Sequence, residues 1–180
     1  MSIFPDVVLA GGTDWVRHAH ETVVQFVVQQ LTVNGWVEVP TNFGVTPVHF
    51  EEIQPEEAGK DLTPNTVSIT LGDVPEQRLE QLGGGLYSLA IPIFVDIYGE
   101  KANVAVSIAD DVRRLLTDRA IPIFDFTHPD NPVPKVGAYI EFEQVVGPRK
   151  PAAAAEASAE LRRNWRVVKA TAVSYFTADF

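Results

Sequence analysis

The spacing of apolar residues along the chain predicts two amphipathic helices. The first is expected to begin at Thr13, which can cap its first turn, and to end at Asn34-Gly35. Its apolar positions recur every three or four residues and comprise Trp15, Ala19, Val23, Phe26, Val27 and Leu31. The second is expected to begin near Asn103, with an apolar stripe that comprises Val104, Ala105, Ile108, Val112, Leu115 and Leu116. The first helix is therefore expected to pack one face on a sheet, and the second carries a similar stripe.

A period of two residues predicts the strands. The longest covers residues 86–98, where aliphatic side chains alternate from Leu89 to Ile97 while Phe94, Asp96 and Tyr98 point to the other face. Further strands are expected at residues 36–40, 66–73, 121–124, 136–147 and 164–176. Pro92 has no amide hydrogen, so its position must face an edge, a bulge or the start of regular pairing. Residues 75–82 are expected to form two helical turns, and the glycines at 83–85 a flexible entry to the long strand.

The tetrapeptide IPIF occurs twice, at residues 91–94 and 121–124. The flanking sequences share no pattern beyond an early aspartate, so we interpret the copies as two apolar strand segments rather than a duplication. Because the second helix lies between them, residues 91–124 are expected to form a strand–helix–strand unit.

Two stretches fit neither period. Residues 41–66, rich in proline and glutamate, are expected to form an inserted loop or hairpin, and the alanine-rich residues 148–160 a connector without an apolar stripe. The strand that follows the connector is too short to fold alone. We therefore expect residues 1–180 to form a single domain.

Composition narrows the possible functions. The net charge of -10 and pI near 4.8 disfavour a nucleic-acid-binding surface, so no sequence-specific nucleic-acid partner is expected. Cysteine is absent, which excludes disulfides, thiolate metal sites and a cysteine nucleophile. The N-terminus lacks a basic region and carries Asp6 in its apolar stretch, and no run of about 18 apolar residues occurs. We expect a soluble, intracellular protein without a membrane partner.

No residue pattern predicts catalysis. His18 and His20 stand two apart on a helix and so point in different directions, and His49 and His128 have no partner at a recognisable spacing. Neither a GxSxG nor an HExxH motif is present. A solvated acidic loop, rather than a cation site, is expected from Glu51, Glu52, Glu56, Glu57 and Asp61. The expectation is a protein that is not an enzyme and uses no cofactor or metal.

Other charged and aromatic residues have a structural interpretation. Solvent-exposed carboxylates are expected at Asp96, Asp110 and Asp111, and the three tryptophans are expected to pack in the fold. Charge is segregated at one basic cluster, which comprises Arg149, Lys150, Arg162, Arg163, Arg166 and Lys169. This cluster is suited to an acidic partner surface.

The order of elements resembles the tail terminator and tail completion proteins of long-tailed bacteriophages. The resemblance rests on the long strand "LYSLAIPIFVDIYGE", which runs directly into the helix "ANVAVSIADDVRRLL", and on the last strand "RVVKATAVSYF". It implies an α+β fold, with a single mixed, mainly antiparallel sheet and two main helices packed on it. It also implies a subunit that assembles into a ring, expected to be a hexamer, at the head-proximal end of the tail tube.

A virion protein of this kind would stop tube polymerisation and provide the surface for joining the head. Its partners would be other copies of itself, the tail tube protein, and a head connector or head-closure protein, first in the host cytoplasm and then in the virion. Contacts between subunits are expected from Glu51, Glu52, Glu56 and Glu57 on one copy to Arg162, Arg163 and Arg166 on the next. The alternatives are another neck protein, either a head-tail adaptor or a head-closure protein, and a small-molecule-binding domain or enzyme.

Overall fold

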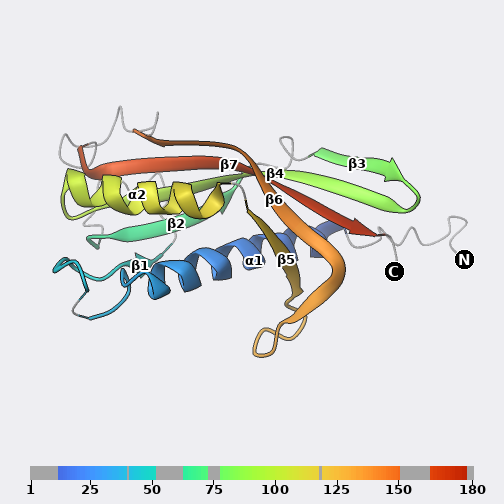
Figure 1. The fold of residues 1–180 in the computed structure, drawn as a ribbon, viewed down its shortest axis with the longest axis horizontal. Coiled ribbons are helices and arrows are strands. Elements are labelled where there is room, and N and C mark those ends of the chain that lie inside the picture. The colour runs from blue at the N-terminus through green and yellow to red at the C-terminus, as the bar shows by residue number, and fades with distance from the viewer. Residues whose placement is uncertain are drawn as a thin grey trace, which may run out of the picture.

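The computed structural model describes residues 12–39, 41–51, 63–72, 78–117, 119–150 and 163–177. They form two helices and one strongly curled, mixed, mostly antiparallel sheet of seven strands (Figure 1). The strand order is β1-β2-β4-β7-β6-β5, and β3 pairs with β4 beyond the end of β2. The α+β fold predicted from the sequence is therefore confirmed.

The elements have the following bounds. The helices are α1 (Gly12–Val33) and α2 (Ala102–Leu116). The strands are β1 (His49–Phe50), β2 (Thr66–Leu71), β3 (Arg78–Gly83), β4 (Leu86–Tyr98), β5 (Ala120–Asp125), β6 (Val133–Arg149) and β7 (Trp165–Thr177). Neither helix in this part of the chain is long and apolar enough to cross a membrane.

The hydrophobic core lies between the concave face of the sheet and both helices, and the apolar stripe of α1 is buried in it together with that of α2. The alternation predicted for β4 is confirmed, because Leu89, Ile91, Ile93, Val95 and Ile97 are all buried. The stripe predicted on α2 is buried as well, with Ala109 added to it. Both elements were predictable because a helix with one apolar face and a strand with one apolar face have different periods.

Pro92 lies where the pairing along one side of β4 is interrupted. The last residue of β2, Leu71, pairs with Ile93, whereas β3 begins its pairing at Ala90. The carbonyl of Pro92 accepts a hydrogen bond from Gly72 at 2.7 Å. The missing amide of Pro92 therefore faces the break between β2 and β3, as expected for a proline within a sheet.

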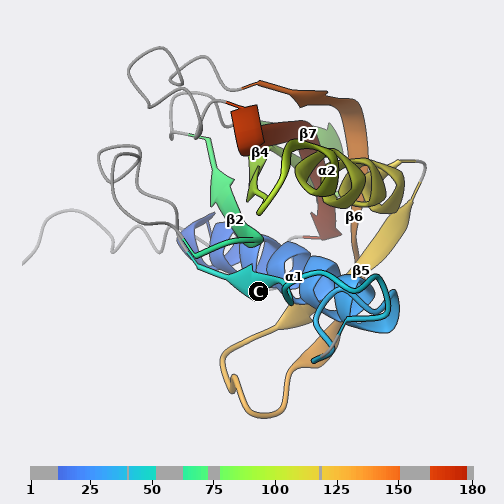
Figure 2. The same cartoon turned by 90° about the vertical axis from the view of Figure 1, so that its left-hand side faces the viewer.

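Helix α1 lies across the open side of the curled sheet (Figure 2). The hydroxyl of Thr22 accepts a hydrogen bond from the amide of Phe124 at 3.1 Å, and Nδ1 of His18 accepts one from the amide of Phe126 at 3.0 Å. On its other side, Nε2 of His20 lies 3.4 Å from the carbonyl oxygen of Ile69 in β2. Side chains of α1 thus contact the backbone at both edges of the sheet, which keeps the edge amides of β5 from pairing elsewhere.

The end of α1 explains why no strand forms at residues 36–39. Gly35 has a φ of 82° and donates its amide to Thr32, and Trp36 donates its amide to Leu31. These two bonds form a Schellman cap, in which the glycine adopts the left-handed conformation. The strand predicted at residues 36–40 is therefore wrong, because the amide of Trp36 completes the helix instead of a ladder. The predicted stop at Asn34-Gly35 is confirmed.

Residues 78–83 form a strand where helical turns were predicted. β3 pairs with β4 through a two-residue turn at Gly84 and Gly85, whose φ angles are 60° and 79°. A turn with two positive φ angles matches the twist of a hairpin, and glycine adopts it at the lowest cost. Pairing with the long strand β4 overrides the local helical pattern, and the glycines form the hairpin turn rather than a flexible entry.

The inserted segment contains one short strand. β1 pairs with Thr66 and Val67 in parallel, and the rest of residues 41–51 is irregular. Asn65, at the end of this segment, is fully buried with a φ of 61°. Most of the alanine-rich connector lies outside the described residues, so its predicted structure stays a prediction.

Candidate functional site

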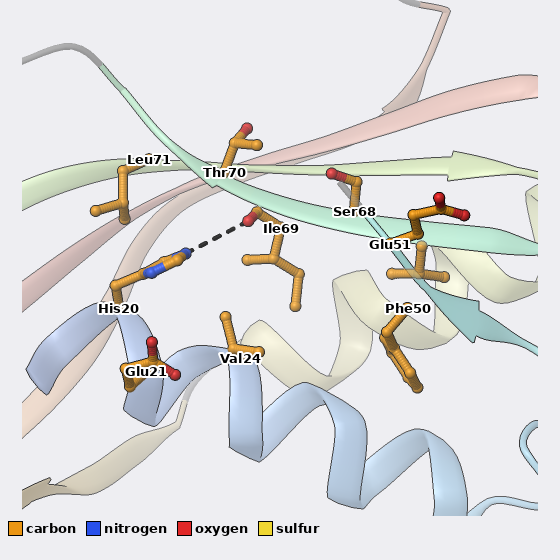
Figure 3. Close-up of a pocket in the computed structure, with 10 residues that line it drawn as sticks. His20, Glu21, Val24, Phe50, Glu51, Ser68, Ile69, Thr70 and Leu71 are labelled. Atoms are coloured by element: carbon orange, nitrogen blue, oxygen red, sulfur yellow. Dashed lines mark hydrogen bonds between the residues drawn. The ribbon is translucent and has the colours of Figure 1, made fainter. Parts of the chain in front are cut away.

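A groove of about 560 Å³ runs between α1 and the outer edge of β2. Its lining residues are His20, Glu21, Val24, Phe50, Glu51, Val67, Ser68, Ile69, Thr70 and Leu71. Figure 3 shows that Glu21 lies near His20 at one end, whereas Glu51 lies near Ser68 at the other. The groove exists because β1 is only two residues long and covers only the first part of β2.

The open edge of β2 directs backbone groups into this groove. The carbonyls of Asn65 and Val67 accept hydrogen bonds from the amides of His49 and Glu51. Because alternate residues of a strand face the same side, the backbone groups of Ile69 and Leu71 also face outward. Among the described residues, no strand pairs with β2 beyond Val67 on this side. Unpaired strand edges of this kind are sites where another chain can bind.

The groove is rich in hydrogen-bond acceptors. Its lining includes two carboxylates, Glu21 and Glu51, and neither arginine nor lysine. His20 contacts the carbonyl oxygen of Ile69 through Nε2, which must carry a hydrogen because a carbonyl only accepts. Val24 and Phe50 add apolar surface. Such a lining suits side chains that are cationic, donate hydrogen bonds and have an aliphatic stem, which are lysine and arginine.

A second groove, of about 440 Å³, lies on the other side of α1. Its lining is mainly apolar and comprises Thr22, Gln25, Phe26, Gln29, Ile121, Pro122, Phe124, Phe126 and Pro132. The edge of β5 here is protected, because α1 binds the amide of Phe124 and that of Phe126, just after β5, and Pro122 has no amide hydrogen. The backbone of β5 is therefore less available to a partner than that of β2.

A third groove, of about 520 Å³, lies between α2 and the loop that follows α1. Trp36 is buried beside it, donates a hydrogen bond to Asp111 at 2.8 Å, and contacts the ring of Phe43. Phe43 is 51% exposed and Val106 is 39% exposed. At a separate place, the hairpin between β5 and β6 exposes Val133 and Val136. Exposed apolar side chains thus occur at both of these places, as in proteins that contact a partner.

The basic cluster is brought together where β6 ends and β7 begins. Arg149 pairs with Val167, next to Arg166, and Arg163 lies two residues before the start of β7. Arg149, Lys150 and Arg163 are exposed. Arg166 is half-buried, and its Nη1 donates to the carbonyls of Arg163 at 2.9 Å and Trp165 at 2.6 Å. The register of two strands thus brings together charges that are separated in the sequence.

Three of the predicted interface residues lie in the described part of the chain. Glu51 is exposed beside β1, whereas Arg163 and Arg166 lie at the start of β7. β2 and β4 separate β1 from β7 in the sheet, so these charges are not adjacent within one subunit. The other four residues, Glu52, Glu56, Glu57 and Arg162, lie outside the described residues. The predicted contact between subunits stays a prediction.

The carboxylates expected to be solvated have partners instead. Nε1 of Trp165 donates to Asp96 at 2.9 Å on the convex face of the sheet. Asp110 forms ion pairs with Arg113 at 2.9 Å and Arg114 at 2.7 Å. Burial raises the pKa of Asp96, and the bond from Trp165 only partly offsets this effect. The expectation of a solvated carboxylate was therefore wrong for Asp96, which is partly buried and bonded to Trp165. Asp110 remains accessible to solvent and is bound by guanidinium groups three and four residues further along α2.

We expect Asp96→Asn to stabilise the protein at pH 7. An acid whose pKa is higher in the folded state favours folding at low pH, and this contribution is lost as the pH rises through the folded pKa. Asparagine can still accept the bond from Trp165 but does not ionise. The melting temperature should rise by a few degrees at pH 7 and change less at pH 4. Asp110→Asn is the control, because hydrogen bonding from Arg113 lowers the pKa of Asp110; a gain there as well would contradict the explanation.

The histidines occupy different environments. His18 is buried against β5, whereas His20 faces the groove beside β2, so the prediction that they point in different directions is confirmed. His49 and His128 are exposed. Within the described ranges, no group of three or more histidine or carboxylate side chains is placed to hold a metal ion.

The role of α1 at the two sheet edges was missed from the sequence. The bond from Phe126 to His18 joins residues 108 apart, and the contact of His20 with Ile69 joins residues 49 apart. The only local signal was the presence of polar residues, His18 and Thr22, next to the apolar positions of an amphipathic helix. Comparison with known proteins adds no family, since no protein-family model and no curated protein matches the sequence.

Proposed function

We propose that this chain is a structural protein of a phage tail, a tail terminator that forms a ring at the head-proximal end of the tail tube. The proposal rests on the passage from β4 into α2, the segment that carries the resemblance to these proteins. β4 ends at Tyr98, and α2 begins at Ala102. In this role the ring stops tube polymerisation and binds the head connector or head-closure protein.

The junction between β4 and α2 is tightly packed. A Cβ atom at Gly99 would lie 2.6 Å from the amide nitrogen of Ala105 and 2.8 Å from its Cβ. The amide of Gly99 donates to the carbonyl of Asn164, at the start of β7. This packing fixes the direction of α2 across the sheet, so that the strand and helix form one rigid unit. A rigid unit suits a subunit that must present the same surface at every position of a ring.

The surface of the subunit supports head-to-tail assembly. The acceptor-rich groove beside β2 and the basic cluster at the end of β6 differ in charge and lie on different strands. Apolar surface is also divided between the groove beside α2 and the hairpin between β5 and β6. Contacts between unlike surfaces generate a ring when the rotation closes. A hexameric ring, expected from the resemblance, is part of the proposal.

The test is the morphology of particles made without this protein. A terminator predicts tails of uncontrolled length that lack heads, and in complete particles a single ring of this protein at the head-proximal end of the tube. Electron microscopy of purified tails measures both. Tails of normal length that fail to join heads would assign the chain to another neck protein, such as a head-tail adaptor or head-closure protein. Normal, infectious particles without the protein would refute a role in the neck.

A further inference from the structure

The groove beside β2 lacks cationic side chains of its own. It offers the carboxylates of Glu21 and Glu51 and the outward-facing carbonyl of Leu71, whereas the carbonyl of Ile69 already contacts His20. Glu51 is exposed and Glu21 is half-buried. Neither glutamate forms an ion pair within the described part of the chain. An occupant that donates hydrogen bonds and carries positive charge would satisfy these groups.

Cationic side chains without acidic partners occur at the end of β6. Arg149 and Lys150 are exposed, and within the described ranges they form no ion pair. Arg166 fits the groove less well, because its guanidinium already binds two carbonyls of its own chain. Arg149 is the last residue of β6, so the two side chains project from the end of a strand rather than from within the sheet.

These cations cannot reach the groove of their own subunit. β4 and β7 lie between β2 and β6, which makes three strand spacings. At about 4.8 Å for each spacing, the distance across the sheet is roughly 14 Å. An arginine or lysine side chain is too short to span it. A cation from the end of β6 can therefore enter such a groove only in another copy of the chain.

We infer that the groove between α1 and β2 binds Arg149 and Lys150 from the end of β6 of a second copy. The inference rests on the ring assembly proposed above and identifies one contact within it. Arg149 and Lys150 pair with Glu21 and Glu51, and their donors also reach the carbonyl of Leu71. The methylene stems pack on Val24 and Phe50. Two acidic grooves repel each other, so the contact is head to tail and leaves a free groove and a free β6 end at each step.

Charge reversal and its rescue test this contact in the full-length protein. The variants are E21K/E51K, R149E/K150E, and the combination of all four substitutions. Self-association is measured by analytical ultracentrifugation at low salt over a range of protein concentrations. We expect each double variant to raise the concentration needed for assembly about tenfold, which corresponds to about 1.4 kcal/mol. The fourfold variant should assemble at nearly the wild-type concentration, because the pairs are restored with opposite sign.

Two controls separate this contact from general charge effects. E143K/K101E changes exposed charges outside the groove and the end of β6, and should assemble like the wild type. Because the chain has no cysteine, Thr70→Cys and Val146→Cys can be made as separate single-cysteine proteins and mixed. A disulfide-linked dimer should form from the mixture under oxidation, and addition of 1 M salt, which screens charges, should reduce its yield.

Several results would overturn the inference. The first is a wild-type protein that stays monomeric at millimolar concentration. The second is a fourfold variant that does not regain assembly. The third is assembly that is weakened by E21K/E51K but not by R149E/K150E, which would indicate a different basic partner. None of these results bears on tail length, so the proposed function can survive the loss of this contact. Conversely, the fourfold variant could regain self-association while particles made without the protein are normal. This pair of results would support the contact and refute the tail function.

Discussion

Asn65→Ala is expected to reduce the free energy of unfolding by about 3–5 kcal/mol. Asn65 is fully buried, and its Nδ2 donates to the carbonyl of Thr46 at 2.6 Å while its Oδ1 accepts the amide of Glu100 at 2.8 Å. Alanine leaves the carbonyl of Thr46 and the amide of Glu100 without this partner, and because both residues are half-buried the cost is about 1–2 kcal/mol each. It must also adopt the left-handed conformation of Asn65, with a φ of 61°, at roughly 1 kcal/mol.

The cost of the left-handed backbone conformation can be separated from the cost of the lost hydrogen bonds with Asn65→Gly. Glycine adopts the left-handed conformation without strain but makes neither side-chain bond. Urea denaturation should therefore rank the proteins as wild type, Asn65→Gly and Asn65→Ala, from most to least stable, with about 1 kcal/mol between the two variants. Equal stability of the variants would show that the backbone conformation contributes nothing. A loss below 1 kcal/mol in both would contradict the role of the hydrogen bonds.

Ile93→Ala is the second substitution with a large expected effect. Ile93 is 1% exposed at the middle of β4, on the face that packs against α2. Val112 of α2 is fully buried in the same core, as expected if both residues lie on the apolar face of their element. Removal of three methyl or methylene groups leaves a cavity, and truncations of this kind typically cost about 2–5 kcal/mol.

Ile93→Val provides a graded comparison. It removes one carbon and should cost only about 0.5–1.5 kcal/mol. Both losses in the free energy of unfolding are measured from the midpoint of urea denaturation. The dependence of this free energy on urea concentration should be the same in both variants, which would show that they expose the same surface on unfolding. A loss that does not increase from valine to alanine would show that the space at Ile93 collapses or is filled, contrary to a closely packed core.

The parts of the fold that were predictable are those in which one element carries its own pattern. Val104, Ile108 and Val112 share one face of α2 by their spacing alone, and Ile91 to Ile97 share one face of β4. Each apolar pattern is repeated at least three times along its element, so tertiary contacts do not override the secondary structure that it predicts. The direct passage from β4 to α2 was predictable for the same reason, because Gly99 separates two strong periods.

Pairing partners determined the parts that were not predictable. Residues 78–83 form a strand because β4 extends beyond β2 and offers a free side to pair with. The two glycines of the turn, Gly84 and Gly85, were the available hairpin signal. Residues 36–39 are rich in residues that favour strands, yet the amide of Trp36 binds Leu31 in the helix cap. Local sequence does not contain the identity of such partners.

The candidate site depends even more on distant partners. The groove exists because β1 ends after two residues and leaves the rest of the outer edge of β2 unpaired beside α1. Only Glu51 of the expected acidic loop could be placed beside it. The basic cluster was visible as a composition bias, but its position opposite β7 follows from the pairing of Arg149 with Val167. Charge could therefore be read from the sequence, whereas its location could not.

The position of α1 across both sheet edges has a consequence for synthesis of the chain. α1 precedes the sheet in the chain, and two residues that it binds, Phe124 and Phe126, lie 102 and 108 residues after Thr22 and His18. At roughly 5–20 residues per second, about 5–20 seconds pass before β5 follows the helix out of the ribosome. During this time His18 and Thr22 of α1 lack the backbone amides that they bind in the folded protein. Among the described helices and strands, α1 is thus made before those it packs against, and chaperones that bind exposed apolar helices would have this interval in which to act.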